Sequence, residues 1–282
     1  MTVKIITDST SNLPDRIKEE YEIEVVSLNI ILDGKSYKEV ELDNKKFYED
    51  MDKAKEIPTS SQPALDDMMK VFEKNLSEGY DIISIFLSSK MSGTFSSAHL
   101  IKEMMLEKYP EREIEIIDSK SNCMQMGYAV LEAAKAAKEG KSLDEIKDIV
   151  LHVIDNSRFL FSPESLMYLK KGGRIGGASA LLGSILQIKP ILTVEEGVTT
   201  VFDKVRTKKR AVNAMVNKVL EDSKNKRIKG ITVHHINCVD EGNALAELLR
   251  EKLNVEVHVE KIGPVIGLHV GPGSIGIAYY TE

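Results

Sequence analysis

The sequence is poor in the features that mark disulfide-rich, membrane-spanning and metal-binding proteins. Its 282 residues contain two cysteines, Cys123 and Cys238, whose wide separation forms neither a metal-ligand nor a redox spacing. No apolar run is long enough to span a bilayer, and the first expected strand, residues 3–6, leaves no room for a signal peptide. We therefore expect a cytoplasmic protein in a reducing compartment, with no membrane span.

Charge and composition further limit the functional class of the protein. The net charge is −6 at pH 7 and the pI is about 5.7, which argues against general binding of nucleic acid, so no nucleic-acid partner is expected. Charged residues make up 29% of the chain and hydrophobic residues 42%, as in ordinary globular proteins. Tryptophan is absent, whereas the 11 methionines could line a pocket for a flexible chain or simply fill the core.

Short apolar runs alternate with helical patterns along the first half of the chain. This alternation predicts an α/β domain over residues 1–156, with a parallel sheet covered on both faces. From residue 157 the pattern changes to hairpins and long crossovers, which predicts a second α/β domain with a mixed sheet over residues 157–282. The pattern also predicts a strand at 25–32, a hairpin turn at 33–34, a loop at 58–63, a helix at 178–186 and a glycine-rich stretch at 263–276 before a final strand.

The stretch from residue 81 to 108 combines a strand, a hydroxyl-rich turn and a helix start. The isoleucine-rich run 82–87 is typical of a strand buried on both faces. The turn after it contains Ser92, Gly93 and Thr94, where free backbone N–H groups and the positive end of a helix dipole meet. Such a turn favours an anionic oxygen, a carboxylate or a phosphate. The alternative is that Ser92 or Thr94 only caps the helix.

Other loops could contribute to the same site. Hydroxyl-bearing loops at 8–11 and 118–121 also follow predicted strands, and ligands of parallel sheets bind at the carboxyl ends of the strands. The loop at 59–62, with Ser60 and Ser61, could join them from the side.

Two glycine-rich motifs do not predict nucleotide binding. Residues 271–276 match G-x-G-x-x-G, but no helix or further βα unit follows, and the informative neighbour is His269. Residues 172–177 lack the Gly-Lys-Ser/Thr ending of a P-loop, although Arg174 could bind an anion through two hydrogen bonds. A glycine turn beside a satisfied histidine, and a surface arginine, are the alternatives.

No metal site or cofactor is expected. His234 and His235 are adjacent in a predicted strand, so their rings point to opposite faces. No nucleophile elbow and no close acidic pair stands out, which favours a binding protein over an enzyme. The basic run 206–210 either is a solvated helix start capped by Thr207 or docks an acidic partner through residues such as Arg206.

Several short motifs together resemble the DegV family of bacterial lipid-binding proteins, the fatty acid kinase B-type subunits. The similarity spans nearly the whole chain. The motifs are I-I-T-D-S-T at 5–10, T-S-S-Q-P at 59–63, S-G-T at 92–94, D-S at 118–119 with M-G at 126–127, K-G-G-R-I at 171–175, K-P-I-L at 189–192, R-T at 206–207 and H-V-G-P-G at 269–273.

The resemblance implies a two-domain DegV-like α/β fold that holds a long-chain fatty acid between its domains. The acyl tail would enter the interior of residues 1–156, and residues 157–282 would close the head-group site and dock the partner. That partner would be the A-type subunit, an ATP-dependent kinase that forms an acyl phosphate for phospholipid synthesis. By motif, the carboxylate ligands would be Ser60, Ser61, Ser92, Gly93, Thr94, Arg174 and His269, with Arg206 facing the kinase.

Family members often carry threonine at the position of Ser60, so Thr59 is an alternative donor. Two other functions remain as alternatives. One is a hydrolase or transferase acting on a small anionic substrate, with Ser92 as nucleophile and His269 as base. The other is a protein-interaction module in which the pocket is incidental.

Overall fold

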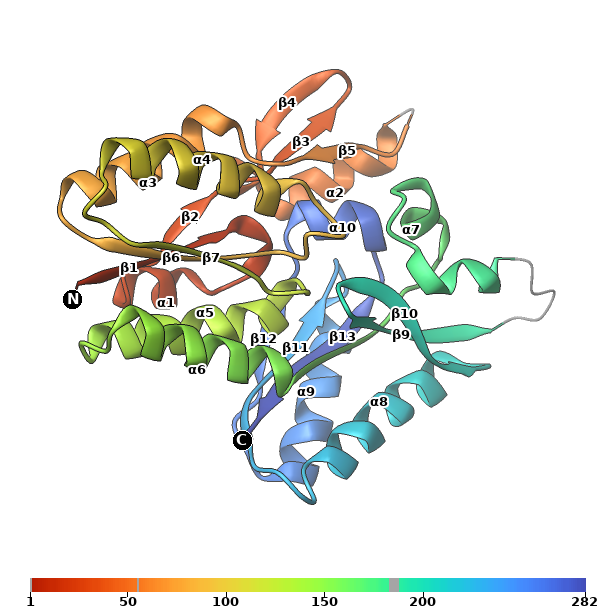
Figure 1. The fold of residues 1–282 in the computed structure, drawn as a ribbon. Coiled ribbons are helices and arrows are strands. Elements are labelled where there is room, and N and C mark those ends of the chain that lie inside the picture. The colour runs from red at the N-terminus through yellow and green to blue at the C-terminus, as the bar shows by residue number, and fades with distance from the viewer. Residues whose placement is uncertain (1, 55, 183–187) are drawn as a thin grey trace.

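The first half of the chain is built on a parallel sheet of strand order β2-β1-β6-β7 (Figure 1). The computed structural model describes residues 2–54, 56–182 and 188–282. The predicted doubly buried strand at 82–87 is confirmed, because β6 is buried at five of its six residues. The strands of this sheet are β1 (Val3–Asp8), β2 (Glu24–Val26), β6 (Asp81–Phe86) and β7 (Ile114–Asp118).

Helices cover both faces of this sheet, as the alternating pattern predicted. One pair packs against Ile82 and Phe86, and the other packs against Ile83 and Ile85. Figure 1 shows the first pair above the sheet and the second pair below it. The pairs are α3 (Leu65–Ser77) with α4 (Thr94–Lys108), and α5 (Cys123–Lys138) with α6 (Leu143–Asp155); the shorter α1 (Asp15–Glu20) follows β1.

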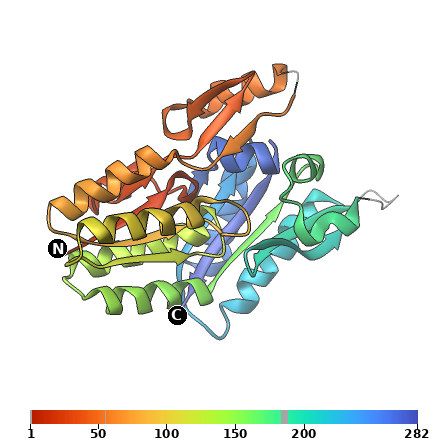
Figure 2. The same ribbon diagram turned by 45° about the horizontal axis from the view of Figure 1, so that its top comes forward.

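A small antiparallel sheet, of order β4-β3-β5, projects from this body, and the structure corrects two predictions here (Figure 2). The strand predicted at 25–32 is two strands, because Leu28 N–H bonds the Ser9 hydroxyl instead of a neighbouring strand. The predicted loop at 58–63 contains a strand, since Ser60 pairs with Ile30. The elements are β3 (Asn29–Leu32), β4 (Lys35–Lys38), β5 (Thr59–Ser61), α2 (Asn44–Lys53) and the 3-10 helices η1 (Ser9–Ser11) and η2 (Glu39–Glu41).

The turn that joins β3 to β4 confirms the predicted hairpin. Asp33 and Gly34 both have positive φ, 48° and 76°, which is the left-handed geometry that two-residue hairpin turns require.

The second half forms a six-stranded mixed sheet of order β10-β9-β8-β13-β11-β12, as predicted. Only β11 and β12 pair in parallel among the described strands of this sheet. The strands are β8 (Ser157–Ser162), β9 (Lys189–Glu195), β10 (Val198–Val205), β11 (Ile228–His235), β12 (His258–Lys261) and β13 (Ile275–Thr281), and α8 (Lys208–Asp222) and α9 (Val239–Leu253) pack on one face.

Helix α5 lies between the two sheets. It packs against the parallel sheet on one side, and on the other its Tyr128 ring lies 4.9 Å from the Tyr280 ring of β13. Small residues such as Ala129 and Ala133 allow this helix to be buried from both sides. The chain passes from one sheet to the other between α6 and β8, which is where we propose to divide residues 1–156 from residues 157–282.

Three short helices complete the region between the sheets, and they correct two further predictions. The glycine-rich stretch 263–276, where no helix was predicted, contains a helix that begins at Pro264. The helix predicted at 178–186 is a 3-10 helix that ends at Leu181, and its remainder at 183–187 lies outside the described residues. The elements are α7 (Met167–Lys171), η3 (Gly176–Leu181) and α10 (Pro264–Val270).

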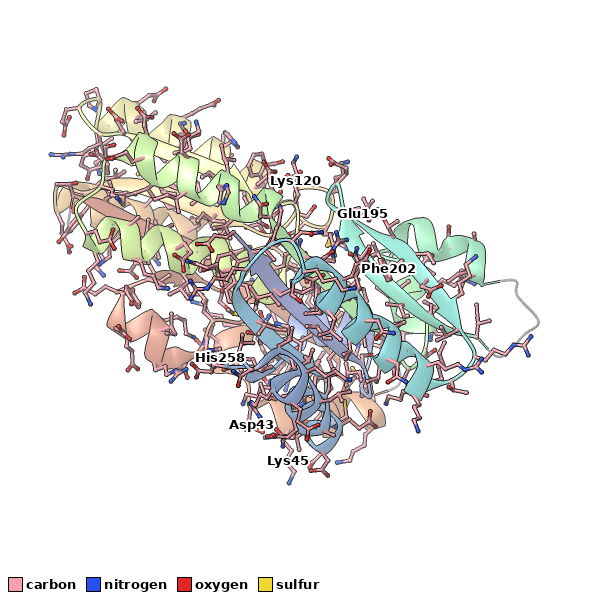
Figure 3. The ribbon with its side chains drawn as sticks, turned by 90° about the horizontal axis from the view of Figure 1, so that it is seen from below. Asp43, Lys45, Lys120, Glu195, Phe202 and His258 are labelled. Atoms are coloured by element: carbon pink, nitrogen blue, oxygen red, sulfur yellow. The ribbon has the colours of Figure 1, made fainter. Side chains whose placement is uncertain are left out.

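Polar contacts join the two halves at the β9–β10 turn. The Ser88 hydroxyl donates to Gly197 O at 2.7 Å, and Lys120 lies 3.7 Å from Glu196. Figure 3 shows Lys120 and Glu195 close together at this junction. None of the helices formed by the described residues is long and apolar enough to cross a bilayer.

Candidate functional site

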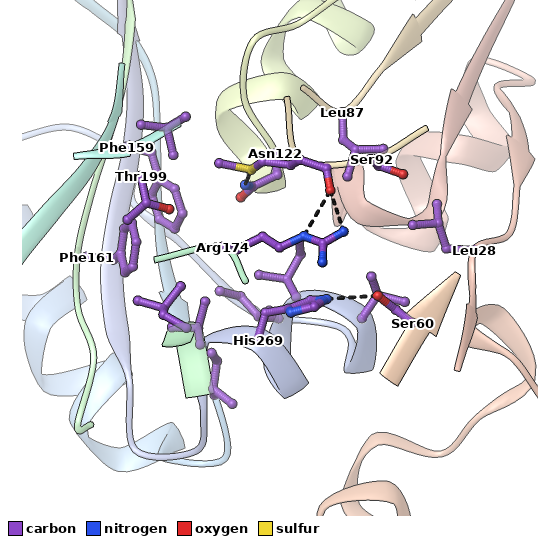
Figure 4. A pocket seen from close by; sticks show the side chains of 18 of the residues that line it. Leu28, Ser60, Leu87, Ser92, Asn122, Phe159, Phe161, Arg174, Thr199 and His269 are labelled. Atoms are coloured by element: carbon purple, nitrogen blue, oxygen red, sulfur yellow. Dashed lines mark hydrogen bonds between the residues drawn. The ribbon is translucent and has the colours of Figure 1, made fainter. Parts of the chain in front are cut away.

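A cavity of about 910 Å³, including its opening to solvent, lies between the two halves (Figure 4). Its mostly apolar walls are typical of small-molecule sites. Residues 1–156 contribute three of its apolar lining residues, and residues 157–282 contribute ten. These are Leu28, Leu87 and Met91 from the first half, and Phe159, Phe161, Leu169, Val194, Ile236, Ile262, Val265, Ile266, Val270 and Ile275 from the second.

Ser60 and His269 meet at one end of the cavity. The Ser60 Oγ lies 2.8 Å from His269 Nε2, although 209 residues separate them. Strand β5 turns Ser60 inward, while Thr59 and Ser61 are exposed. Burial, with a smaller effect of the nearby Arg174 guanidinium, lowers the pKa of His269 to about 4. The imidazole is therefore neutral at pH 7 and carries one N–H.

A glycine allows the chain to pass directly beside this histidine. A Cβ placed on Gly172, the residue that ends α7, would lie 2.1 Å from His269 Nδ1, which is far inside van der Waals contact. His269 Nδ1 is buried and has no hydrogen-bond partner among the described residues. The ring therefore has one nitrogen bound to Ser60 and one nitrogen, next to Gly172, that has no partner among the described residues.

Arg174 joins the segment after α7 to the turn before α4. Its Nε and Nη2 atoms donate to Met91 O at 3.0 and 2.8 Å, and Nη1 donates to Gly172 O at 2.7 Å. The guanidinium is exposed and has N–H groups beyond these three bonds, so it can also bind an anion. It is the only charged side chain among the described residues that line the cavity.

The predicted turn at the start of α4 contributes two of its three residues. Ser92 and Gly93 line the cavity, and the first N–H groups of a helix have no partner within the helix. Thr94 is fully buried and does not line the cavity; instead its Oγ1 lies 2.9 Å from Ser92 Oγ. Thr94 therefore positions Ser92, contrary to the expectation that it contacts the ligand.

The remaining predicted residues divide between the cavity and the surface. Ser61 lines the cavity mouth, whereas Arg206 is exposed at the end of β10. Six residues of β10, 200–205, separate Arg206 from Thr199 in the cavity wall, and seven steps of about 3.3 Å span roughly 23 Å.

The pair needed for the hydrolase or transferase alternative is not formed. His269 bonds Ser60, and Ser92 bonds Thr94. A general base works best with a pKa near the working pH, and burial holds the pKa of His269 at about 4.

The motifs did not identify the aromatic and aliphatic wall of the cavity. Phe159 and Phe161 alternate along β8, and their rings are stacked 5.1 Å apart. Gln62, which lines the cavity and donates to Ser97 Oγ at 2.7 Å, lies in the 59–62 loop that was expected to join the site, but it was not named among the ligand residues. Period-two alternation marks Phe159 and Phe161 as sharing a face of β8, but no local signal says that this face borders a cavity.

A buried carboxyl group holds the helix that carries His269. Glu39 Oε1 accepts the N–H of Val265, in the first turn of α10, at 2.8 Å. Burial is the main cause that raises the pKa of Glu39 to about 7, so the group is half protonated near neutral pH.

The raised pKa of Glu39 leads us to expect that wild type and Glu39→Gln differ in stability by an amount that depends on pH. The unfolded chain releases the Glu39 proton near 4.5 and the folded chain near 7, so the unfolding free energy falls as pH rises between these values. Glu39→Gln keeps an acceptor oxygen and removes this loss. Relative to wild type, the variant should gain about 2 kcal/mol between pH 5 and pH 7, measured by urea unfolding. The exposed neighbour Glu41 supplies the control Glu41→Gln, and an equal gain there would contradict the assignment.

Comparison with known proteins shows the family to which the chain belongs. The family model described as uncharacterised protein, DegV family, matches residues 2–282. A DegV domain-containing protein of Clostridium acetobutylicum is 54% identical over 282 residues, covering 100% of this chain and 99% of the relative. The structure of DegV from Bacillus subtilis, described as a fatty acid binding protein, has a TM-score of 0.89 at 34% identity and covers 100% of both chains. A DegV family structure from Thermus thermophilus, described as showing fatty acid binding, has a TM-score of 0.89 at 29% identity and also covers 100% of both chains. The chain belongs to the DegV family.

Proposed function

We propose that this chain binds a long-chain fatty acid, with the acyl tail in the cavity and the carboxylate at the Ser60–His269 end. The observation that carries this proposal is a mostly apolar cavity with the hydrogen-bonded Ser60–His269 pair at one end. The fatty acid binding described for the Bacillus subtilis and Thermus thermophilus relatives supports it.

The tail supplies most of the affinity. Each buried methylene contributes about 0.8 kcal/mol, so ten contribute about 8 kcal/mol before the cost of association. The resemblance implied that the tail enters the interior of residues 1–156. Because ten of the thirteen apolar lining residues lie in residues 157–282, we propose instead that the tail packs mainly against that half.

The head group is held by neutral donors and one arginine. A carboxylate out of water needs several donors, and Ser60, Ser92, the first turn of α4 and His269 can supply them. Arg174 adds a positive charge at the mouth. No lysine lines the described part of the cavity, so the carboxylate is not fixed by a buried ammonium group.

We further propose that the chain is a carrier and that a separate kinase performs the chemistry, in the cytoplasm, where ATP is available. The carboxylate oxygen would attack the γ-phosphorus of ATP, the bond to the β–γ bridging oxygen would break, and ADP would leave. The acyl phosphate would then enter phospholipid synthesis. The kinase would supply the nucleotide and metal, and this chain would need no cofactor.

Native mass spectrometry of the purified protein tests lipid binding. We expect a stoichiometric mass excess that extracts into organic solvent as a fatty acid. A bare protein that also fails to bind added stearate and oleate would contradict the proposal.

Arg206→Ala separates partner docking from lipid binding. Because Arg206 lies outside the cavity, its loss should leave the Kd for stearate within twofold and lower kinase-dependent acyl phosphate formation about tenfold, as for a charge pair worth about 1.4 kcal/mol. Arg227→Ala removes the same charge from an exposed site outside the cavity and is the control. Equal losses of lipid affinity and turnover in Arg206→Ala would rule out a docking role.

A further inference from the structure

Asn122 occupies a helix-capping position but does not cap the helix. It directly precedes α5, where asparagine side chains normally accept a backbone N–H from the first turn. Its side chain makes no such bond. The Met124 N–H of that turn donates instead to His234 Nε2 at 3.2 Å, across the boundary between the two halves. His234 Nδ1 lies 3.2 Å from Glu260 O, which fixes the tautomer that leaves Nε2 as an acceptor. The histidine thus takes over the usual task of the asparagine.

The amide of Asn122 lies in the cavity wall. The residue is 6% exposed, and its neighbour Cys123 has a positive φ of 50°, a conformation that a non-glycine residue rarely adopts. Nδ2 donates to Met91 Sδ at 3.3 Å, whereas Oδ1 is buried with no hydrogen-bond partner among the described residues. The cavity wall therefore contains a strong acceptor that has no partner among the described residues.

This acceptor is separate from the head-group site. Figure 4 shows Ser60 on one side of the cavity and Thr199 with Phe159 on the other, with Asn122 between Ser92 and Thr199. Thr199, which is 3% exposed, also lines the cavity and adds a hydroxyl to the same wall. A fatty acid held at Ser60 and His269 would pass this wall with its tail.

We propose that the cavity selects a long-chain fatty acid that carries a hydroxyl group on its acyl chain, which donates to Asn122 Oδ1. This inference rests on the proposed function and adds the class of ligand. A hydroxyl fits because it is neutral, so burial costs less than for an amine, and because it can donate to Asn122 while accepting from a second donor such as Thr199. An unsubstituted chain leaves the amide oxygen without a partner.

Binding of matched fatty acids tests the proposal. The Kd of the intact protein, freed of lipid, is measured for stearate and for stearates hydroxylated at positions 3, 7, 10 and 12. At least one isomer should bind about tenfold more tightly than stearate, which corresponds to about 1.4 kcal/mol. In Asn122→Leu, this preference should disappear and stearate should bind more tightly than to wild type, because leucine removes the open acceptor.

Gln125→Leu is the matched control. Gln125 is an equally buried amide one turn further along α5, but it bonds Ser121 and Ser157 and does not line the cavity. Its replacement should leave the preference for the hydroxylated chain unchanged.

The outcomes separate this inference from the proposed function. If stearate binds and every hydroxylated isomer binds equally or less tightly, a water molecule satisfies Asn122 and the inference is overturned, while the carrier function stands. If no fatty acid binds, the proposed function fails. The wild-type comparison decides the inference even where Asn122→Leu does not fold, and a preference that survives in folded Asn122→Leu also overturns it.

Discussion

Replacing Val194 by tryptophan is expected to weaken stearate binding about 150-fold while the protein remains folded. Val194 lies in β9, is 7% exposed and lines the cavity, so a larger side chain can extend into the cavity. An indole there would displace about four methylenes of the tail. At about 0.8 kcal/mol each, the loss is about 3 kcal/mol, or about 150-fold in Kd.

Because the native chain has no tryptophan, the fluorescence of Val194→Trp shows where the new indole lies. The new indole is the only one in the chain, so its emission maximum shows whether it lies in an apolar environment. Val239→Trp, at a position that is 52% exposed at the start of α9, is the control and should keep wild-type affinity and emit like an indole in water. A fatty acid four carbons shorter than stearate should lose much less affinity for Val194→Trp. Full stearate affinity together with blue-shifted emission would show that the tail does not pass Val194.

The features predictable from sequence are those set by local pattern. The run at 82–87 is a buried strand because nearly every residue in it is apolar, and the Ser92–Gly93 turn follows where the strand ends. Asp33 and Gly34 form the predicted hairpin because their turn preference acts over two residues. In each case the residues that decide the structure are neighbours in the chain.

The features that were missed depend on partners distant in sequence. α10 begins at Pro264 but lies in a glycine-rich stretch, and distant partners stabilise its start: Glu39 accepts the Val265 N–H and Asn12 accepts the Gly263 N–H, over separations of 226 and 251 residues. β5 is a strand because it pairs with β3. No local rule predicts such pairings, since they exist only after the rest of the chain has folded.

The candidate site also contains features that were predictable from local sequence and features that were not. Short motifs marked Ser60, Ser92 and His269, because hydroxyls and glycines in loops have a recognisable pattern, and the structure places all three at the cavity. The tail direction that we propose was not predictable, because the cavity wall formed by Phe159 and Phe161 has the pattern of an ordinary strand face.

Gly172→Ala is expected to lower kinase-dependent acyl phosphate formation about 100-fold without a large loss of stability. Gly172 has an ordinary helical φ of −75°, so alanine suits the backbone. Its Cβ would lie 2.1 Å from His269 Nδ1, and the ring must move. That movement breaks the 2.8 Å contact with Ser60 and, in the complex that we propose, displaces the carboxylate; a misplacement of about 1 Å costs on the order of 100-fold in rate.

A readout that does not need the kinase makes this prediction specific. Burial holds the pKa of His269 at about 4, so a ring pushed toward solvent should titrate nearer its ordinary value of 6.5, as followed by NMR. Gly177→Ala is the matched control, because this glycine lies in the same segment, with a φ outside the left-handed region, and an added Cβ there meets only ordinary contacts at 3.6 and 3.8 Å. It should preserve both the histidine titration and the rate. If Gly172→Ala keeps the low pKa and full turnover, the ring tolerates the methyl group, and the close approach of α7 to His269 has no part in presenting the carboxylate. A raised pKa with full turnover would instead show that the head group is held without His269, by Ser92 and Arg174.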